Sequence, residues 1–128
     1  MRSERSLNDV YERRFDEDAA RSKDAIWAEI ARYLGRWIAP DSAVLELGCD
    51  RGHFIRNIRA RERCGTDVRD MAEYLEPGVA FVQADGLTLR DHLQFAHYDV
   101  VFASNYLEHL PSAEAVVEQL REIGRAHV

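Results

Sequence analysis

Two glycines and two carboxylates surround the end of an apolar segment in the first half of the chain. Val44–Leu47 is typical of a buried strand and contains Glu46. The turn that follows it consists of Gly48, Cys49, Asp50, Arg51 and Gly52. Glycine tolerates positive φ and carries no Cβ, so such a turn lets bare backbone approach a ligand. These residue types favour recognition of a cofactor, and a plain tight turn between a strand and a helix remains the alternative.

A further carboxylate follows at a distance typical of nucleotide-binding units. Asp67 ends a second predicted strand nineteen positions after Gly48, close to the roughly 20 residues at which an acidic side chain reaches a ribose. A carboxylate at this place can accept hydrogen bonds from both ribose hydroxyls, although a simple turn aspartate would look the same. The glycines fall at the first and fifth places of the turn. The fingerprint of nicotinamide dinucleotides is therefore not matched, because it needs the first, third and sixth.

Two more polar positions follow predicted strands. Asp85 and Gly86 come after the third strand and Asn105 after the fourth. Ligands of open α/β sheets bind at the carboxyl ends of the strands, so we expect these positions to share one edge with Gly48 and Asp67. An ordinary Asp-Gly turn is the alternative for Asp85.

Strands alternate with helices along the rest of the chain. Apolar runs predict strands near 43–47, 64–67, 79–82 and 98–104, and helices over 53–60 and 71–75. A last helix begins after Ser112 and ends near Gly124, and its predicted inner stripe is Val116, Val117, Leu120 and Ile123. Because the fourth strand is apolar nearly throughout, helices must cover both faces of the sheet. The predicted fold class is α/β, with a Rossmann-like, doubly wound, mostly parallel sheet of about four strands.

An N-terminal helical segment over residues 1–40 precedes a domain over residues 41–128. We expect a partly exposed helix over 6–21 and a second helix over 24–38. The apolar residues of the second helix recur at helical spacing and predict one buried stripe, formed by Trp27, Ile30, Ala31, Leu34, Trp37 and Ile38. Pro40 disfavours helix at the residue before it.

Composition limits the classes of function. The chain has 128 residues, 46% of them apolar, and a formal net charge of −6, which argues against bulk binding of nucleic acid and favours a small acceptor. Two cysteines, Cys49 and Cys64, predict buried reduced thiols. Cys49 and His53 lie one helical turn apart without further ligands nearby, so we expect no metal site. No signal peptide or membrane span is apparent, which predicts a cytoplasmic protein.

Taken together, these motifs resemble class I S-adenosylmethionine-dependent methyltransferases from about Ala43 to Gly124. Glu46, Gly48 and Gly52 match the first motif of that family, acidic-x-Gly-x-Gly-x-Gly, with Asp50 in place of the middle glycine. Aspartate tolerates left-handed geometry. Tyr98–Asn105 and the following Tyr106–Pro111 resemble the motif of the fourth strand. The resemblance implies S-adenosyl-L-methionine as the cofactor, held by Glu46, Gly48, Cys49, Asp50, Gly52, Asp67, Val68, Asp85, Gly86 and Asn105.

The resemblance also implies roles for single residues. Asp85 would meet the exocyclic amine of adenine, and Asn105 would face both cofactor and substrate. The expected reaction is in-line transfer of the sulfonium methyl to a small acceptor, with most of the chemistry supplied by the cofactor. His109 is the candidate general base, although a histidine at such a place more often packs locally.

The family sheet has seven strands, whereas this chain ends shortly after the helix that follows the fourth. We therefore expect a domain without the C-terminal strands, with a strand order that resembles 3-2-1-4 and an exposed fourth strand that favours self-association. The alternative function is a non-catalytic module that binds the cofactor or a partner.

Overall fold

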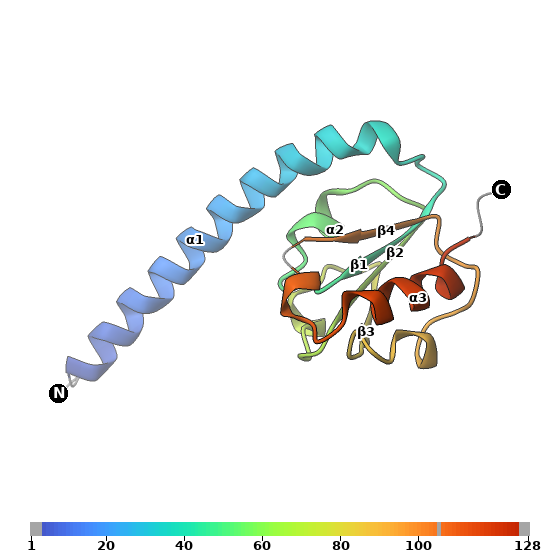
Figure 1. The fold of residues 1–128 in the computed structure, drawn as a ribbon. Helices are drawn as coiled ribbons and strands as arrows, with labels where there is room; N and C mark the ends of the chain where they lie inside the picture. The colour runs from blue at the N-terminus through green and yellow to red at the C-terminus, as the bar shows by residue number, and fades with distance from the viewer. Residues whose placement is uncertain (1–3, 105, 126–128) are drawn as a thin grey trace.

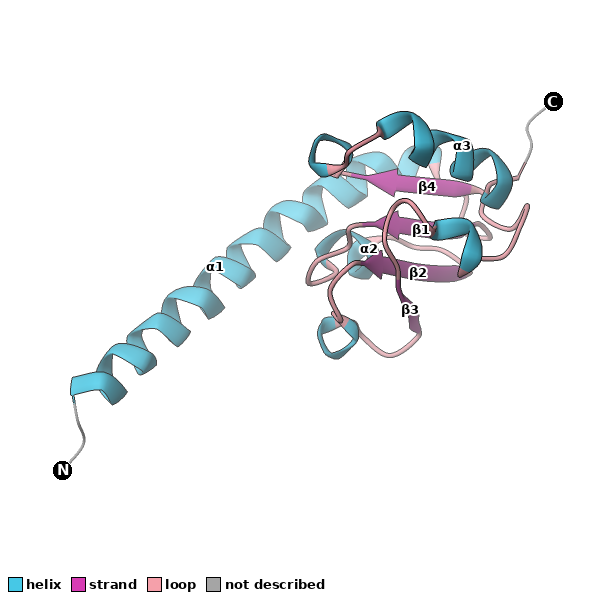
Figure 2. Ribbon diagram, turned by 60° about the horizontal axis from the view of Figure 1, so that its bottom comes forward, coloured by secondary structure: helices cyan, strands magenta, loops and turns pink. Residues whose placement is uncertain are grey.

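Four parallel strands form the centre of the fold (Figure 1). The computed structural model describes residues 4–104 and 106–125, and the side chains of residues 17–104 and 106–125. The strands are β1 (Ala43–Leu47), β2 (Glu62–Asp67), β3 (Val79–Gln83) and β4 (Val100–Ala103). Figure 2 shows them side by side in the order β3-β2-β1-β4. The predicted α/β class and strand order are confirmed, because every strand pair in the described sheet is parallel.

Helices cover both faces of the sheet, as a strand buried on both sides requires. All five residues of β1 are buried, and their side chains alternate between two apolar clusters. Leu45 and Leu47 join a cluster with Val116 and Ile123 of α3 (Ala113–Ile123). Val44 joins the other cluster, which contains residues of α1 (Glu4–Leu34) and α2 (His53–Asn57). Glu46 is two positions after Val44, so its side chain lies on the same side of the sheet, the face that α1 and α2 cover.

The N-terminal segment forms one continuous helix instead of the two that we expected. Its C-terminal part packs on the sheet, and the rest extends away from the domain (Figure 1). Trp27 meets the rings of Phe54 and Phe102 edge-on, with centroid distances of 6.4 and 6.0 Å. The prediction that Trp37 belongs to the buried stripe is wrong, since this residue is 63% exposed. The helix ends at Leu34 and a 3₁₀ turn over Gly35–Trp37 follows, which changes the angular spacing of the side chains.

Several elements are shorter than the sequence predicted. α2 ends at Asn57 because the next residue, Ile58, adopts an extended conformation and is buried in the core. A single 3₁₀ turn, Ala72–Tyr74, replaces the predicted helix over 71–75. β4 begins at Val100, after a side-chain hydrogen bond in which the Asp99 carboxylate accepts from the backbone of Ala43 at 2.8 Å.

The inner stripe of α3 contains a polar residue that the pattern of apolar residues did not predict. Val117 was expected in the stripe but is 43% exposed, whereas Gln119 is buried. The amide nitrogen of Gln119 donates to the carbonyl oxygen of Gly86 at 2.9 Å, and its oxygen accepts from the backbone of Arg90 at 3.1 Å. Gln119 therefore fastens α3 to the loop that follows β3. As predicted, Ser112 caps the helix, accepting from the backbone of Ala115 at 3.2 Å.

Among the described residues, β4 pairs with β1 alone and β3 with β2 alone, so these two strands form the edges of the sheet. None of the helices among these described residues is both long enough and apolar enough to cross a membrane. The division of the chain between residues 40 and 41 stays a prediction.

Candidate functional site

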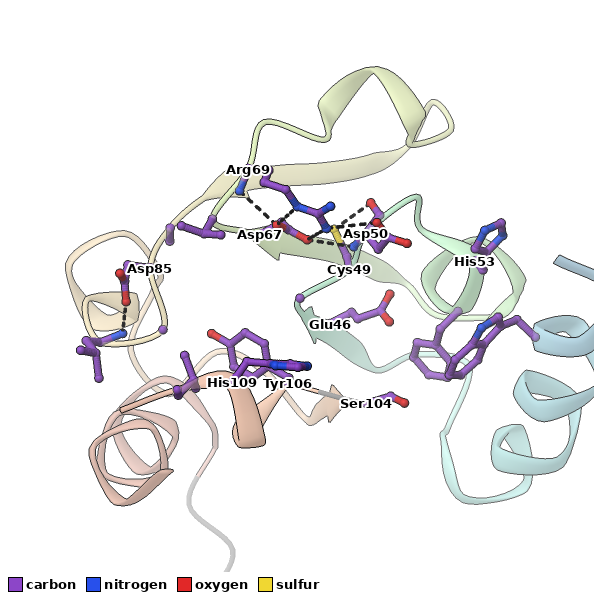
Figure 3. Close-up of a pocket in the computed structure, with 18 of the residues that line it drawn as sticks. Glu46, Cys49, Asp50, His53, Asp67, Arg69, Asp85, Ser104, Tyr106 and His109 are labelled. Carbon is purple, nitrogen blue, oxygen red and sulfur yellow. Dashed lines mark hydrogen bonds and ion pairs between the residues drawn. The ribbon is translucent and has the colours of Figure 1, made fainter. Parts of the chain in front are cut away.

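A cavity of about 660 Å³ opens where the strands of the sheet end (Figure 3). The side chains and glycines that were expected at this edge meet in its wall. The predicted residues that line it are Glu46, Gly48, Cys49, Asp50, Asp67, Val68, Asp85, Gly86 and His109. Gly52 does not line the cavity, and Asn105 lies outside the described residues.

The turn after β1 places three residues in left-handed geometry within five positions. Gly48, Asp50 and Gly52 have φ values of +64°, +51° and +76°. A Cβ on Gly48 would lie 2.7 Å from the ring of Tyr106, so only glycine leaves room for the aromatic wall of the cavity. A Cβ on Gly52 would collide with the side chain of Leu75, which explains this glycine through packing at the start of α2. Asp50, which stands in place of the middle glycine of the motif, adopts the same left-handed backbone conformation as the two glycines.

The carboxylate of Asp67 is buried and holds the turn from the neighbouring strand. Its Oδ2 accepts from the backbone N–H of Asp50 at 3.0 Å, and its Oδ1 accepts from the backbone N–H of Arg69 at 3.0 Å. The guanidinium of Arg69 adds two hydrogen bonds at 3.1 Å, from Nε to Oδ1 and from Nη2 to Oδ2. Figure 3 shows the side chain of Arg69 next to those of Asp67 and Asp50, joined to them by dashed lines. Burial pushes the pKa of Asp67 upward, but the hydrogen bonds and the charge of Arg69 outweigh it and leave the pKa below its usual value.

Arg69 also joins Asp67 to the residue that replaces the glycine. Its Nη2 lies 3.0 Å from Oδ1 of Asp50, so one guanidinium pairs with two carboxylates. The Arg69 side chain is 59% exposed, whereas that of Asp67 is 5% exposed. Sequence reasoning did not select Arg69, because a single arginine in a loop carries no signal of its own.

Glu46 has the most perturbed carboxyl group of the cavity wall. The residue is buried, and its Oε1 has no hydrogen-bond partner among the described residues. Burial raises the pKa of Glu46 to about 8, assisted by the negative charges of Asp50 and Asp67 and opposed by a hydrogen bond from the backbone of Ile55. The group is therefore mostly protonated at neutral pH unless a cation approaches it.

Cys49 lines the cavity but does not act as a nucleophile. Both cysteines are buried and free, as predicted. Burial raises the pKa of the Cys49 thiol to about 12, and the charges of Glu46 and Asp67 act in the same direction. Because the thiolate is the reactive form, this thiol is inert near neutral pH.

The loop after β3 forms the opposite wall. Asp85 is exposed, and its Oδ1 accepts from the backbone N–H of Leu87 at 2.8 Å, which is the hydrogen bond of an Asx turn. A Cβ on Gly86 would collide with the hydroxyl of Tyr106. Burial raises the pKa of the Tyr106 phenol. Tyr106 belongs to the fourth-strand motif, but no pattern in that motif predicted that its ring would lie between the glycine turn and this loop.

The remaining wall comes from α1 and α2 and was not predicted. Lys23, Trp27 and His53 line the cavity there. His53 is buried, and its Nδ1 lies 3.3 Å from Oδ1 of Asp24, a residue of α1. His53 Nε2 has no hydrogen-bond partner among the described residues. The predicted histidine, His109, is mostly exposed and lies 3.8 Å from Glu108.

Comparison with known families identifies the family to which the chain belongs. The sequence profile of the family described as "Methyltransferase domain" matches residues 13–125, which is most of the chain. The chain belongs to this family. The resemblance that was inferred from the glycine turn and the strand ends is thus confirmed, and the match extends through most of α1 as well.

Several solved structures that share the fold are methyltransferases, and their sequence identities establish the fold alone. One from Archaeoglobus fulgidus, a SAM-dependent methyltransferase, is 23% identical with a TM-score of 0.65, covering 90% of this chain and 54% of its own. One from Mesorhizobium loti is 20% identical with a TM-score of 0.59, covering 66% and 43%. CalH in complex with SAH is 19% identical with a TM-score of 0.60, covering 77% and 33%. The chain thus spans between a third and about half of the length of these proteins. No curated protein matches it.

Proposed function

We propose that this chain binds S-adenosyl-L-methionine in the cavity and transfers its methyl group to a small acceptor. Membership of the family supports the activity, and CalH, which shares the fold, was solved with the demethylated product. The observation that carries the proposal is the convergence of Glu46, Gly48, Asp67 and Asp85 around one cavity of about 660 Å³. A volume of this size is typical of sites for small ligands and cofactors.

Each wall of the cavity has a role in this proposal. Asp67 binds the ribose hydroxyls, because it is a buried and ionised carboxylate at the end of β2. Asp85 meets the adenine amine, and the exposed side chain of Val68 packs on the adenine ring. The backbone around Gly48, Cys49 and Asp50 approaches the methionine part of the cofactor, and Asn105 faces both cofactor and acceptor.

Glu46 balances the positive charge of the cofactor. Its orphaned oxygen, Oε1, is a buried acceptor in the wall of the cavity, and an unpaired buried polar group is costly unless a ligand pairs with it. The acidic residues Asp50, Asp67 and Asp85 outnumber the cations Lys23 and Arg69 among the described lining residues, and Glu46 adds a further negative charge when it ionises beside the ligand. The resulting negative potential favours a ligand with a sulfonium and an ammonium group.

The cofactor supplies an electrophilic methyl group, and the protein supplies orientation and exclusion of water. In well-aligned systems, orientation contributes about 7 to 11 kcal/mol. When bound, the cofactor would supply a sulfonium methyl group for in-line transfer to the acceptor. His109, in the wall of the cavity, would take up the proton that the acceptor loses.

A second candidate is a module that binds the cofactor or a partner without catalysis. It is favoured by β4, which pairs on one side only among the described strands and presents a free edge to a second copy. A cytoplasmic location remains part of the proposal.

Titration calorimetry with S-adenosylmethionine and S-adenosylhomocysteine tests the proposal. We expect both ligands to bind, and Asp67→Asn to weaken binding by about one to two orders of magnitude through loss of charge-assisted hydrogen bonds. Asp91→Asn is the matched control, because Asp91 is exposed and does not line the cavity. Absence of heat from both ligands would remove the cofactor site. Binding without transfer of labelled methyl to a panel of phenols and amines would favour the non-catalytic module.

A further inference from the structure

The carboxylate proposed to bind the ribose has no acceptor capacity left. A carboxylate offers about four lone-pair sites, and Asp67 receives four hydrogen bonds, two at each oxygen. Two come from the backbone N–H groups of Asp50 and Arg69, and two come from the guanidinium of Arg69. This inference rests on the proposed function, since it concerns how the same site admits its cofactor.

The two kinds of donor differ in how easily they can leave. The backbone N–H groups of Asp50 and Arg69 are fixed by the turns that follow β1 and β2. The Arg69 side chain is 59% exposed and ends a flexible stem. When two ribose hydroxyls donate to Asp67, the side chain of Arg69 is thus the donor that gives way.

We infer that Arg69 is an internal competitor of the ribose and sets the affinity and the selectivity of the cofactor site. It occupies the free carboxylate in place of the two hydroxyls and must move off Asp67 before they can bind. A ligand without these hydroxyls does not need this movement. The contact therefore reduces the affinity for the ribose ligand more than the affinity for a deoxy analogue.

Asp50 can keep the guanidinium of Arg69 paired after it has left Asp67. Nη2 of Arg69 lies 3.0 Å from Oδ1 of Asp50, whose side chain is 44% exposed at the rim of the cavity. A small rotation that breaks the contacts with Asp67 can keep this pair. The aspartate that replaces the motif's glycine thus acts with Arg69, and the negative charge that it adds near the cofactor is neutralised.

The test compares Arg69→Met with Arg51→Met by titration calorimetry. Arg51 is the matched control, because it carries the same charge in the glycine turn but lies over the ring of Tyr74, 5.1 Å from its centroid, and outside the wall of the cavity. The probes are S-adenosylhomocysteine and its 2′,3′-dideoxy analogue. Both have a neutral thioether, so that a change of field at a sulfonium does not contribute.

We expect Arg69→Met to bind S-adenosylhomocysteine about 3- to 20-fold more tightly than the wild type. The range reflects the contact that the ribose no longer has to displace, which is stronger than an exposed ion pair and weaker than a fully shielded set of charge-assisted hydrogen bonds. The gain for the dideoxy analogue should stay below about twofold, and Arg51→Met should leave both affinities unchanged. In thermal melts, Arg69→Met without ligand should melt at a lower temperature than the wild type, while S-adenosylhomocysteine should stabilise it more.

The outcomes separate this inference from the proposed function. If the wild type binds S-adenosylhomocysteine and Arg69→Met binds it equally well or more weakly, the inference is overturned and the cofactor site stands. An equal gain for both probes would also overturn it, because the effect would then be one of charge and not of competition with the ribose. If no form of the protein binds either probe, the proposed function fails, and the inference fails with it.

Discussion

The unusual pKa of Glu46 predicts that cofactor binding depends on pH. In the free protein, this carboxyl group has a pKa of about 8 and is mostly protonated at pH 6.5. A cation that binds beside it favours the ionised form and lowers the pKa. Binding of S-adenosylmethionine should therefore release a proton from Glu46, and its affinity should rise with pH up to about 8.

The magnitude follows from the size of the shift. The pKa of Glu46 rises from 4.5 to about 8, and about 3.5 units at 1.36 kcal/mol each correspond to roughly 5 kcal/mol against the ionised form. A bound cation that recovers about two of these units would lower the pKa of Glu46 to about 6 and strengthen binding by about 100-fold between the limits of low and high pH, of which about 20-fold falls between pH 5.5 and 7.5. We expect a change of about 10- to 30-fold over this range.

Titration calorimetry measures both the affinity and the proton. The dissociation constant of S-adenosylmethionine is determined at several pH values up to 7.5, because the amino group of the ligand itself titrates nearer to pH 8. Repeating the titration at pH 6.5 in buffers with different ionisation enthalpies counts the protons that are released. We expect about 0.7 proton for the wild type, the difference between a carboxyl group of pKa about 8 and one of pKa about 6 at this pH. We expect close to none for Glu46→Gln, whose affinity should stay at the level that the wild type has at low pH.

Two results would refute this reasoning. The first is an affinity of the wild type that does not change between pH 5.5 and 7.5. The second is a pH dependence that persists in Glu46→Gln, which would assign the proton to another group. Asp67 is excluded as the source, because its pKa lies below its usual value and it is ionised throughout this range.

Three predictions concern stability. Gly48→Ala should lower the free energy of unfolding by about 1 to 3 kcal/mol in urea melts, since φ is +64° and the new Cβ would press on a ring, whereas Gly35→Ala, with nothing within 4 Å, should not destabilise. Asp67→Asn should lower the free energy of unfolding by about 1 to 3 kcal/mol at pH 7. This difference from the wild type should shrink as pH falls below about 4, because the ionised carboxylate stabilises the fold and is lost as the pH falls through its lowered pKa. Ser112→Ala should cost about 1 kcal/mol through the lost cap on the backbone of Ala115, with circular dichroism as the readout.

The sequence by itself determined the order of the elements and the edge at which the site lies. Apolar runs marked all four strands, and their alternation with helices predicted a parallel sheet. In such a sheet the carboxyl ends of the strands meet at one edge, so Glu46, Gly48, Asp67 and Asp85 could be grouped before any contact was known. These features depend on local backbone preferences and on chain order, which a sequence displays directly.

Only the tertiary structure decided which partner each side chain has. Arg69 spans Asp50 and Asp67, and Asp24 of α1 reaches His53 across 29 positions of the chain. Gln119 of α3 is buried because its amide bonds to the loop at Gly86. No local pattern predicts these contacts, since each depends on how separate elements pack. The same packing sets the pKa of Glu46, whose burial by α1 and α2 is a property of the assembled fold and not of the residues beside it in the sequence.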